Sequence, residues 1–386
     1  MFMFFKNFKL FVKIFFFSKW IFTPPPKKKF LIIDGENNPF DNYLKKKSYN
    51  IFYRRGEEIN LAVLLNCIFN FKFSILDYYE QYIKFVCPKV ILTAFDHYPS
   101  FYRLSKKFKI NTIIVTVGSR TPSDGLFATK FGKTKNKDNY VDHIFTFNET
   151  MAKLYRKMTN GNIYATGSFI NNIKRKKIKR KKNEILFIST FKSPSKIWPT
   201  NRAEKILTHA DFQKNDKYLI KNLSIYAKKN NLKLNVLGRQ RGSYIELEKK
   251  YFKDIIVDNF YYFSKDHHKD SYFLMSQFKY VFTTWSTLGL ENLVKDGRTG
   301  FIYNKPKNPA WNDARLGCYE NLKPRGPFWT TTKAEDVKEF YRIFDVVVKK
   351  NEKYWKVLRN KYKKKLLEYD ENNQTFLNII NKILSK

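Results

Sequence analysis

Short apolar runs, each about as long as one β-strand, recur along the chain after residue 30. The run Phe30-Leu31-Ile32-Ile33 ends in Asp34-Gly35, as expected of a buried strand followed by a turn. Alternating strands and helices predict a mostly parallel sheet covered on both faces. The expected strands of this first series continue at 50–53, 89–94, 112–117, 143–147 and 163–166, and the expected helices lie at 59–69, 75–86, 101–108 and 149–158.

A run of basic residues at 174–182 interrupts this pattern, and no hydrophobic core could contain it. We therefore expect a domain boundary there, followed by a second alternating series and a helical tail at 334–383. The expected strands of the second series lie at 185–189, 232–237, 254–257, 280–283 and 301–303, and its helices at 211–228, 244–251, 270–277 and 288–294.

The predicted fold class is α/β, with two doubly wound Rossmann-like domains facing a cleft and with helices at the C-terminus. Ligands of open α/β sheets bind at the carboxyl ends of the strands, so the cleft is the expected site. The predicted division is 1–26 for a leader, 27–173 for the first domain, 174–183 for a basic linker, 184–333 for the second domain and 334–386 for the C-terminal helices.

The first part of the leader, residues 1–22, is aromatic and apolar but is interrupted by lysines, so it is too charged to span a bilayer. On a helical wheel Lys6, Lys9 and Lys13 form one stripe, and phenylalanines cover much of the rest. This pattern predicts an interfacial helix lying on an anionic membrane. A signal peptide is the competing interpretation, although no small-residue cleavage site precedes Pro24. The leader could also pack on the protein's own surface.

Composition adds a charge that needs a partner. The 386 residues include 74 Lys and Arg against 34 Asp and Glu, a net charge of +40. Codon bias from an AT-rich genome explains part of this excess, and the rest favours anionic partners such as nucleotide phosphates or acidic lipids. The cysteines, Cys67, Cys87 and Cys318, form neither a disulfide framework nor a CxxC pair. We expect buried thiols and a reducing cytoplasm.

The segment 279–291 carries the most informative chemistry. It predicts a strand at 279–284 that passes through a tight turn directly into a helix, which puts free N–H groups and the hydroxyls of Ser286 and Thr287 at a positive helix end. Gly289 would let a phosphate approach the backbone, and Glu291 could accept hydrogen bonds from ribose hydroxyls. The alternative is an ordinary Ser/Thr cap with a first-turn glutamate.

The segment 286–291 resembles the nucleotide-binding loop of GT-B glycosyltransferases and of related polyglycerophosphate and capsule-polysaccharide transferases. The first domain is similar to surface carbohydrate biosynthesis proteins of the lipopolysaccharide or capsule type. The segments that carry this second resemblance, in shared order, lie at 54–60, 88–97, 101–105 and 167–172.

The resemblance implies an enzyme that transfers a sugar, or another group, from a nucleotide-sugar donor to a lipid-linked or growing glycan acceptor. It implies no cofactor beyond this co-substrate, and it places Arg55, Asn60 and Arg120 on the acceptor side. One departure is the turn Thr116-Val117-Gly118-Ser119-Arg120, where a polar Gln-Asn-Gly type of turn is expected. Arg120 could still contact an anionic group.

Transfer needs a base for the acceptor hydroxyl and cations for the leaving diphosphate. Asp96-His97 follows an expected strand and is the first candidate for the base, with Glu57 as its rival; alternatively, Asp96 caps a helix and Glu57 begins one. Arg239 and Arg241 could meet the diphosphate, or could simply be solvated.

No Asp-x-Asp pair occurs, which favours a metal-independent route, and we predict no metal site. His267-His268 resembles a metal cluster only superficially, because adjacent residues do not share a helix face.

Two other interpretations stay open. The same fold could serve a nucleotide-sugar epimerase or a glycerophosphate or phosphosugar transferase. The charge could instead indicate an RNA- or DNA-binding protein, but the lysines are spread along the chain and no zinc-finger spacing or RNP-type signature occurs. We therefore expect no specific nucleic-acid partner, and we expect a cytoplasmic protein that is peripheral on the inner face of the membrane.

Overall fold

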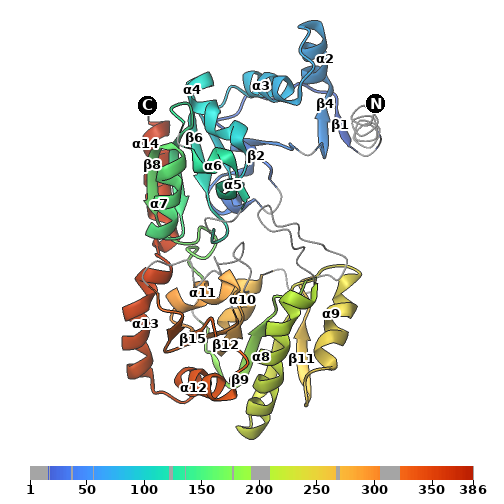
Figure 1. Cartoon of the computed structure of the whole chain (residues 1–386). Helices are drawn as coiled ribbons and strands as arrows, with labels where there is room; N and C mark the ends of the chain where they lie inside the picture. The colour runs from blue at the N-terminus through green and yellow to red at the C-terminus, as the bar shows by residue number, and fades with distance from the viewer. Residues whose placement is uncertain are drawn as a thin grey trace.

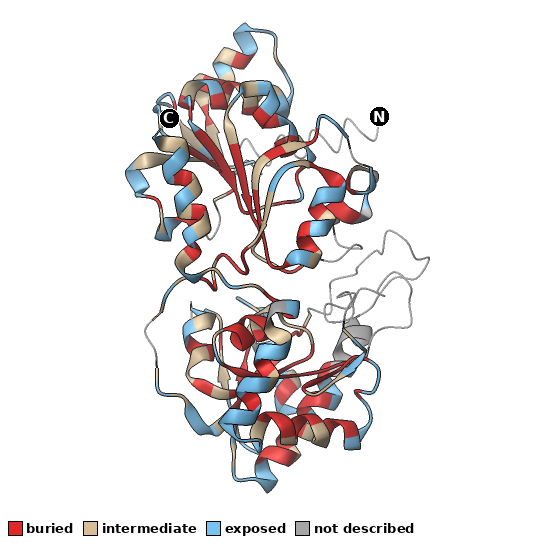
Figure 2. Cartoon of the chain, turned by 90° about the vertical axis from the view of Figure 1, so that its left-hand side faces the viewer, coloured by how far each residue is buried: buried red, intermediate tan, exposed pale blue. Residues whose placement is uncertain are grey.

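The computed structural model describes residues 16, 18–35, 38–54, 56–120, 125–134, 136–175, 178–192, 209–266, 270–304 and 322–385. Two α/β domains follow one another along the chain, each built on its own sheet (Figure 1). Buried residues concentrate along the two sheets and on the inner faces of the helices (Figure 2). The fold class predicted from the sequence is confirmed.

The first domain contains a six-stranded sheet in which every neighbouring pair is parallel. Its order across the sheet is β3 (Tyr49–Phe52), β2 (Phe30–Ile33), β5 (Val90–Thr93), β6 (Asn111–Val115), β7 (Tyr140–Thr146) and β8 (Asn160–Ala165). Its helical segments are η1 (Pro39–Asn42), η2 (Lys46–Ser48), α2 (Leu61–Phe69), α3 (Ile75–Val86), η3 (Pro99–Arg103), α4 (Leu104–Phe108), α5 (Gly125–Ala128), α6 (Lys130–Lys133) and α7 (Glu149–Met158).

Both faces of this sheet are buried, because successive residues of a strand point to opposite faces. In β2, Leu31 and Ile33 pack in one core with residues of α3 and α7. Phe30 and Ile32 pack in a second core on the other face. Uninterrupted apolar strands are what a parallel sheet covered on both faces requires.

The leader and the start of α2 differ from expectation. Residues Lys19–Ile21 form a strand, β1, that pairs in parallel with β4 (Glu58–Asn60). The helix expected from residue 59 therefore begins only at Leu61, after β4. Of residues 1–17, which make up most of the predicted interfacial helix, only Phe16 is among the described residues.

The second domain contains a seven-stranded sheet that is parallel except for β14. Its order is β11 (Phe260–Phe263), β10 (Lys233–Leu237), β9 (Lys181–Ile188), β12 (Phe278–Thr283), β13 (Arg298–Ile302), β15 (Trp329–Thr330) and β14 (Arg325–Gly326). Its helices are α8 (His209–Lys229), α9 (Tyr244–Lys253), α10 (Ser271–Ser276), α11 (Thr287–Val294), α12 (Val337–Val348) and α13 (Glu352–Leu366).

Two expectations for this domain were wrong. The strand β9 starts at Lys181, so the end of the basic run belongs to the sheet rather than to a linker. Residues 254–257 form no strand: they follow α9 as a turn, and the edge strand is the aromatic segment Phe260–Phe263.

The last helix, α14 (Gln374–Leu384), returns to the first domain after the short η5 (Glu371–Asn373). The ring of Phe376 lies 4.9 Å from that of Phe169 and 5.6 Å from that of Phe145, so α14 completes the second core of the first sheet. Figure 1 shows α14 beside α7 and β8, whereas α12 and α13 cover the second domain. The C-terminal helices therefore serve both domains.

Among the described residues, no helix combines the length and the apolar character needed to cross a bilayer. Cys67 is buried, as expected. Cys87 is exposed, contrary to expectation, because it ends α3 in a left-handed conformation with φ 48°.

Candidate active site

The carboxyl ends of β5 and β6, which are neighbours in the sheet, bring an acidic and a basic residue together. Arg120 Nε donates to Asp96 Oδ2 at 2.9 Å, and Arg120 Nη2 donates to Asp96 Oδ1 at 2.7 Å. The hydroxyl of Tyr155, in α7, donates to the same buried carboxylate. Both oxygens of Asp96 are thus occupied by a bidentate ion pair, the strongest geometry for such a pair.

This pairing corrects the role expected for Asp96. Burial alone would raise the pKa of Asp96, but the nearby His97, the charge and hydrogen bonds of Arg120 and the hydroxyl of Tyr155 hold that pKa well below its usual range. A carboxylate with so little affinity for a proton is a poor general base. Asp96 does not cap a helix either, since η3 begins after Tyr98 without a side-chain cap.

His97 is the accessible member of this group. Its Nδ1 lies 3.7 Å from Asp96 Oδ1, and its side chain is 43% exposed. The ring lies against that of Tyr98, with centroids 4.7 Å apart. A carboxylate on one side of an imidazole orients the ring. The arrangement therefore leaves the far nitrogen of His97 as the group that can accept a proton.

Sequence reasoning missed Asp34, which follows β2 in the same row of strand ends. Its Oδ1 accepts the backbone N–H of Arg54 at 2.8 Å, and its buried Oδ2 has no hydrogen-bond partner in the described part of the chain. The guanidinium of Arg54 stacks over the ring of Tyr98, 3.3 Å from its centroid. The available signal was the one used for Asp96, an acidic residue directly after a buried strand.

The other residues predicted for the first domain lie elsewhere. Glu57 is exposed and precedes the strand β4 instead of opening a helix. Asn60 caps α2: its Oδ1 accepts the N–H of Val63 at 3.2 Å, and its Nδ2 donates to the carbonyl of Thr23 at 2.8 Å. The amide of Asn60 is thus used structurally. Arg55 lies outside the described residues.

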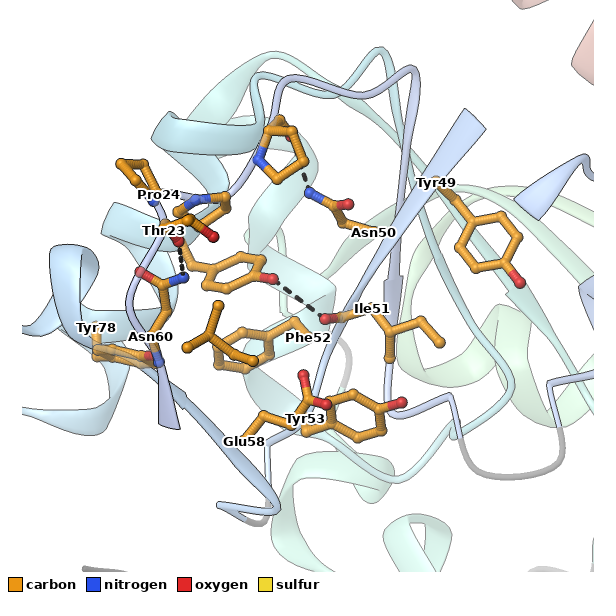
Figure 3. Close-up of a pocket in the computed structure, with 14 residues that line it drawn as sticks. Thr23, Pro24, Tyr49, Asn50, Ile51, Phe52, Tyr53, Glu58, Asn60 and Tyr78 are labelled. Carbon is orange, nitrogen blue, oxygen red and sulfur yellow. Dashed lines mark hydrogen bonds between the residues drawn. The ribbon is translucent and has the colours of Figure 1, made fainter. Parts of the chain in front are cut away.

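Asn60 also lines a pocket of about 320 Å³ between the proline segment, β3 and α3 (Figure 3). Tyr49, Tyr53 and Tyr78 contribute aromatic walls. The amide of Asn50 donates to the carbonyl of Pro26 at 2.8 Å, as that of Asn60 does to Thr23. These two amides bind the proline segment to the domain, so the polar groups of the pocket are largely engaged.

At the carboxyl edge of the second sheet, the buried Glu248 of α9 shapes the loop after β10. Its carboxylate accepts the backbone N–H of Arg239 at 3.0 Å and that of Gln240 at 2.7 Å, together with the hydroxyls of Ser189 and Tyr262. Sequence reasoning missed Glu248, because a glutamate inside an amphipathic helix gives no sign of being buried.

The loop held by Glu248 gathers positive charge. Arg239 and Arg241 are exposed. Burial lowers the pKa of Lys265, and the nearby charges of Arg239 and Arg241 lower it further. Arg239 also donates to the carbonyl of Thr190 at 3.2 Å. Three cations at the end of a parallel sheet form a suitable surface for a diphosphate.

A second buried acid, Asp216 of α8, joins the ends of β9 and β12. It accepts the hydroxyls of Thr190 at 2.8 Å and Thr284 at 3.0 Å. Burial raises the pKa of Asp216 to about 6, although these hydrogen bonds oppose the shift. Asp216 therefore fixes the start of the turn that leads into α11.

In this turn Ser286 and Thr287 are half-buried, and Ser286 makes no side-chain cap, so the ordinary cap interpretation does not apply. Gly289 has a different role from the one expected. A Cβ there would lie 2.8 Å from Thr283 Cγ2 and 3.0 Å from Phe301 Cε1, so the glycine allows α11 to pack closely on β12 and β13. It faces the sheet rather than an incoming phosphate.

Glu291 lies in the contact between the two domains. Its Oε1 accepts hydrogen bonds from Ser168, which follows β8, and from Tyr272, the latter at 3.0 Å. Because Ser168 follows β8, the carboxyl edge of the first sheet contacts α11 of the second domain there. In this arrangement Glu291 is a buried interdomain group and not an open acceptor for ribose hydroxyls.

The remaining expectation concerns metals. His267 and His268 lie outside the described residues. Within the described ranges, no three His, Cys, Asp or Glu side chains come together as a set that could hold a metal ion.

Comparison with solved structures shows the fold. A variant of the wall teichoic acid polymerase TagF is similar over 93% of this chain and 90% of its own, with a TM-score of 0.50 and 12% identity. A variant of S. aureus TarM, in complex with UDP among other ligands, matches with a TM-score of 0.44 and 12% identity over 77% of this chain. The Gap123 complex of Streptococcus agalactiae matches with a TM-score of 0.43 and 12% identity over 80% of this chain.

The chain spans only 55% of the length of the TarM chain and 57% of that of the Gap123 chain. Comparison with curated protein sequences gave no match. One family model, described as "putative O-antigen biosynthesis protein", matches residues 113–384, which is more than half of the chain and includes the whole second domain, the turn at 286–291 and α14. The protein therefore belongs to this O-antigen biosynthesis family.

Proposed function

We propose that the protein is a GT-B-type glycosyltransferase of surface polysaccharide or lipopolysaccharide biosynthesis. It would transfer a sugar from a nucleotide-activated donor to a lipid-linked or glycan acceptor. The observation that carries the proposal is the pairing of His97 with Asp96 at the carboxyl edge of the first sheet, together with Arg239, Arg241 and Lys265 at the carboxyl edge of the second. Membership of the O-antigen family supports the pathway.

In this proposal the far nitrogen of His97 takes the proton of the acceptor hydroxyl, and Asp96 stabilises the imidazolium that forms. The acceptor oxygen forms a bond to the anomeric carbon while the bond from that carbon to the diphosphate oxygen breaks. The electron pair leaves with the nucleoside diphosphate. Arg239, Arg241 and Lys265, with the N–H groups at the start of α11, would stabilise its charge without a metal.

The location of the protein follows from its predicted partners. A lipid-linked acceptor and a basic, aromatic leader favour a cytoplasmic protein that is peripheral on the inner face of the membrane. The leader would hold the first domain, which we propose to carry the acceptor, beside that lipid.

A second candidate keeps the fold and changes the group transferred. The similarity to TagF, a wall teichoic acid polymerase, favours glycerophosphate or phosphosugar transfer as this alternative. The two reactions differ in the nucleotide they release. A sugar transferred from a nucleoside diphosphate sugar leaves the diphosphate, whereas transfer of a phosphorylated group leaves the monophosphate.

The first experiment is a thermal unfolding screen of the full chain with UDP, CDP, GDP and CMP. A ligand that binds only the native state raises the melting temperature. At a ligand concentration of a hundred times the Kd, it adds about 2.7 kcal/mol to the free energy of unfolding. The double variant Arg239→Ala/Arg241→Ala should lose that shift, while Lys356→Ala, on the exposed face of α13, should keep it. Absence of stabilisation by every nucleotide would contradict the proposed donor site.

A further inference from the structure

The hairpin between α2 and α3 carries large apolar side chains that nothing in the described structure covers. Phe71 is 84% exposed, Phe69 77% and Phe73 75%. Four aliphatic neighbours in the same hairpin are also exposed: Leu65, Ile68, Ile75 and Leu76. We call residues 65–76 the aromatic tip. A contiguous exposed apolar surface of this kind marks an interaction site.

The sequence around the tip is unusual for so basic a protein. Between residues 59 and 76 the only charged residue is Lys72, although the chain carries a net charge of +40. Only Val63 and Cys67 of α2 are buried, so the helix is apolar on its outer face as well as on its inner one. A helix that is apolar all round is normally buried in a core or in a membrane.

The backbone at the apex adds an independent observation. Phe71 adopts a left-handed conformation with φ 54°. Its N–H donates to the carbonyl of Ile68 at 3.0 Å, and the N–H of Lys72 donates to that of Cys67 at 2.9 Å. This is a Schellman turn, whose left-handed position strongly favours glycine. A phenylalanine there costs stability, and its ring is 84% exposed, which indicates that the ring is used.

The position of the tip suits a bilayer better than a protein groove. Figures 1 and 2 show the α2–α3 hairpin projecting at the end of the first domain farthest from the second domain. The strand β1 pairs with β4, and β4 runs directly into α2, so the end of the leader lies beside the base of the hairpin. Exposed apolar residues therefore come from both segments, with Phe22 of the leader 72% exposed.

Exposed lysines lie in the segments that flank the tip. Lys19, Lys27 and Lys84 are exposed in the flanking segments. Of the nearby acids, Glu58 pairs with Lys19 at 3.2 Å, Glu80 pairs with Lys107, and Asp77 accepts the hydroxyl of Ser74 at 2.6 Å, whereas Glu57 is exposed. Lysines close to an exposed apolar surface are typical of attachment to anionic lipids.

We propose that the aromatic tip inserts into the headgroup region of an anionic bilayer and forms a docking element separate from the leader. This inference rests on the membrane association included in the proposed function, and it assigns that association to named residues. It does not depend on the transferase chemistry.

The test is flotation of the full chain with vesicles of phosphatidylglycerol and phosphatidylcholine. The variant Phe71→Ser/Phe73→Ser should bind these vesicles more weakly by roughly tenfold per phenylalanine, because each removes a buried ring from the lipid. The matched control is Tyr261→Ser/Val357→Ser, which removes exposed apolar side chains from the second domain and should bind as the unchanged protein does.

A second variant separates lipid binding from folding. Phe71→Gly should raise the melting temperature, since glycine suits the left-handed turn, and should still weaken vesicle binding. Opposite signs in the two measurements would support the proposal. Equal vesicle binding by the unchanged protein and both tip variants would overturn the proposal. A change of oligomeric state in the variants, with vesicle binding unaffected, would also overturn it.

Deletion of residues 1–15 distinguishes this inference from the proposed function. If the deletion abolishes binding while the tip variants bind normally, the leader alone attaches the protein and the inference fails. If the unchanged protein does not bind vesicles, both the inference and the proposed membrane association fail. The nucleotide screen would still test the transferase proposal.

Discussion

The hydroxyl of Ser168 donates a hydrogen bond to the carboxylate of Glu291, across the boundary between the two domains. Asn171 Nδ2 donates to the backbone carbonyl of Glu291 at 3.0 Å, and Lys295 Nζ donates to the carbonyl of Ile173 at 2.7 Å. The segment 167–172, which carries part of the family resemblance, is therefore an interdomain contact. Burial raises the pKa of Glu291 to about 7, despite its hydrogen bonds to Ser168 and Tyr272.

The first prediction concerns pH and the change Glu291→Gln. Folding raises the pKa of Glu291 from 4.5 to about 7, so the protonated carboxyl makes its full contribution to stability below pH 4.5. That contribution is lost as the pH rises to about 7. Gln cannot ionise but still accepts both hydrogen bonds. The variant should therefore be more stable than the unchanged protein at pH 8, by on the order of 3 kcal/mol, and similar to it near pH 4.5.

Urea unfolding at several pH values measures this difference. Glu149→Gln is a suitable control, since the side chain of Glu149 is 56% exposed and its ion pair with Arg156 is on the surface. A stability difference for Glu291→Gln that does not vary with pH would show that the buried carboxyl does not titrate in this range.

The second prediction concerns the ion pair between Asp96 and Arg120. The change Arg120→Ala leaves a buried carboxylate without its cation and should lower the free energy of unfolding by about 3 kcal/mol. Arg156→Ala breaks the exposed pair with Glu149 and should cost less than about 1 kcal/mol. Equal losses for the two variants in urea unfolding would mean that the Asp96 pair is effectively solvated.

The third prediction concerns His97 as the proton acceptor. His97→Asn should lower kcat by roughly a hundredfold or more, because the general base is lost. Since His97 is exposed and lies in the first domain, stabilisation by nucleotide should be retained. Release of nucleotide from a donor sugar, with and without acceptor, measures the turnover. Turnover without acceptor would instead favour an epimerase or hydrolysis, and full activity of the variant would exclude His97 as the base.

The fourth prediction concerns Gly289. A Cβ at this position would lie within 3.0 Å of two core side chains, so Gly289→Ala should destabilise the second domain by about 1 to 3 kcal/mol. At Gly118 the nearest atom to an added Cβ is Arg120 Nη1 at 3.7 Å, an ordinary contact. Gly118→Ala should therefore be nearly neutral in thermal unfolding. A neutral Gly289→Ala would indicate that α11 can shift away from the sheet.

Strands and helices whose pattern was unambiguous could be predicted from the sequence. The helices at Ile75–Val86 and Glu149–Met158 agree with expectation to the residue, because each combines helical spacing with a Ser or Asn cap. The prediction of a strand at 254–257 was wrong, since a short apolar run can also be a turn that buries one side chain, here Ile256. The aromatic edge strand Phe260–Phe263 followed it instead.

The site residues were predicted less well, for a physical reason. Asp96 and Arg120 lie at one edge of the first sheet, because neighbouring strands of a parallel sheet end together. Their position after two expected strands was visible in the sequence, but their pairing was not predicted. Position after a strand could not show that they neutralise each other, since that depends on side-chain distances. Glu248 and Asp216 had no signal, because an amphipathic pattern does not reveal which polar residue of a helix faces inward.

The last prediction concerns the return of α14 to the first domain. Phe376 is fully buried among rings of the first domain, more than two hundred residues away in sequence, so Phe376→Ala should cost about 3 to 5 kcal/mol. The loss should appear in the first domain. Amide hydrogen exchange should therefore accelerate in β2, β5 and β6 and remain unchanged in β9 and β12.

The exposed Asn378 of the same helix provides the control, and Asn378→Ala should leave exchange in both sheets unchanged. For the same reason, residues 27–173 expressed alone should lack a cooperative unfolding transition, because one face of their sheet would be uncovered. Joining residues 367–385 to that fragment through a flexible linker should restore the transition. Cooperative folding of the fragment without α14 would show that the first domain is independent of the C-terminal helix.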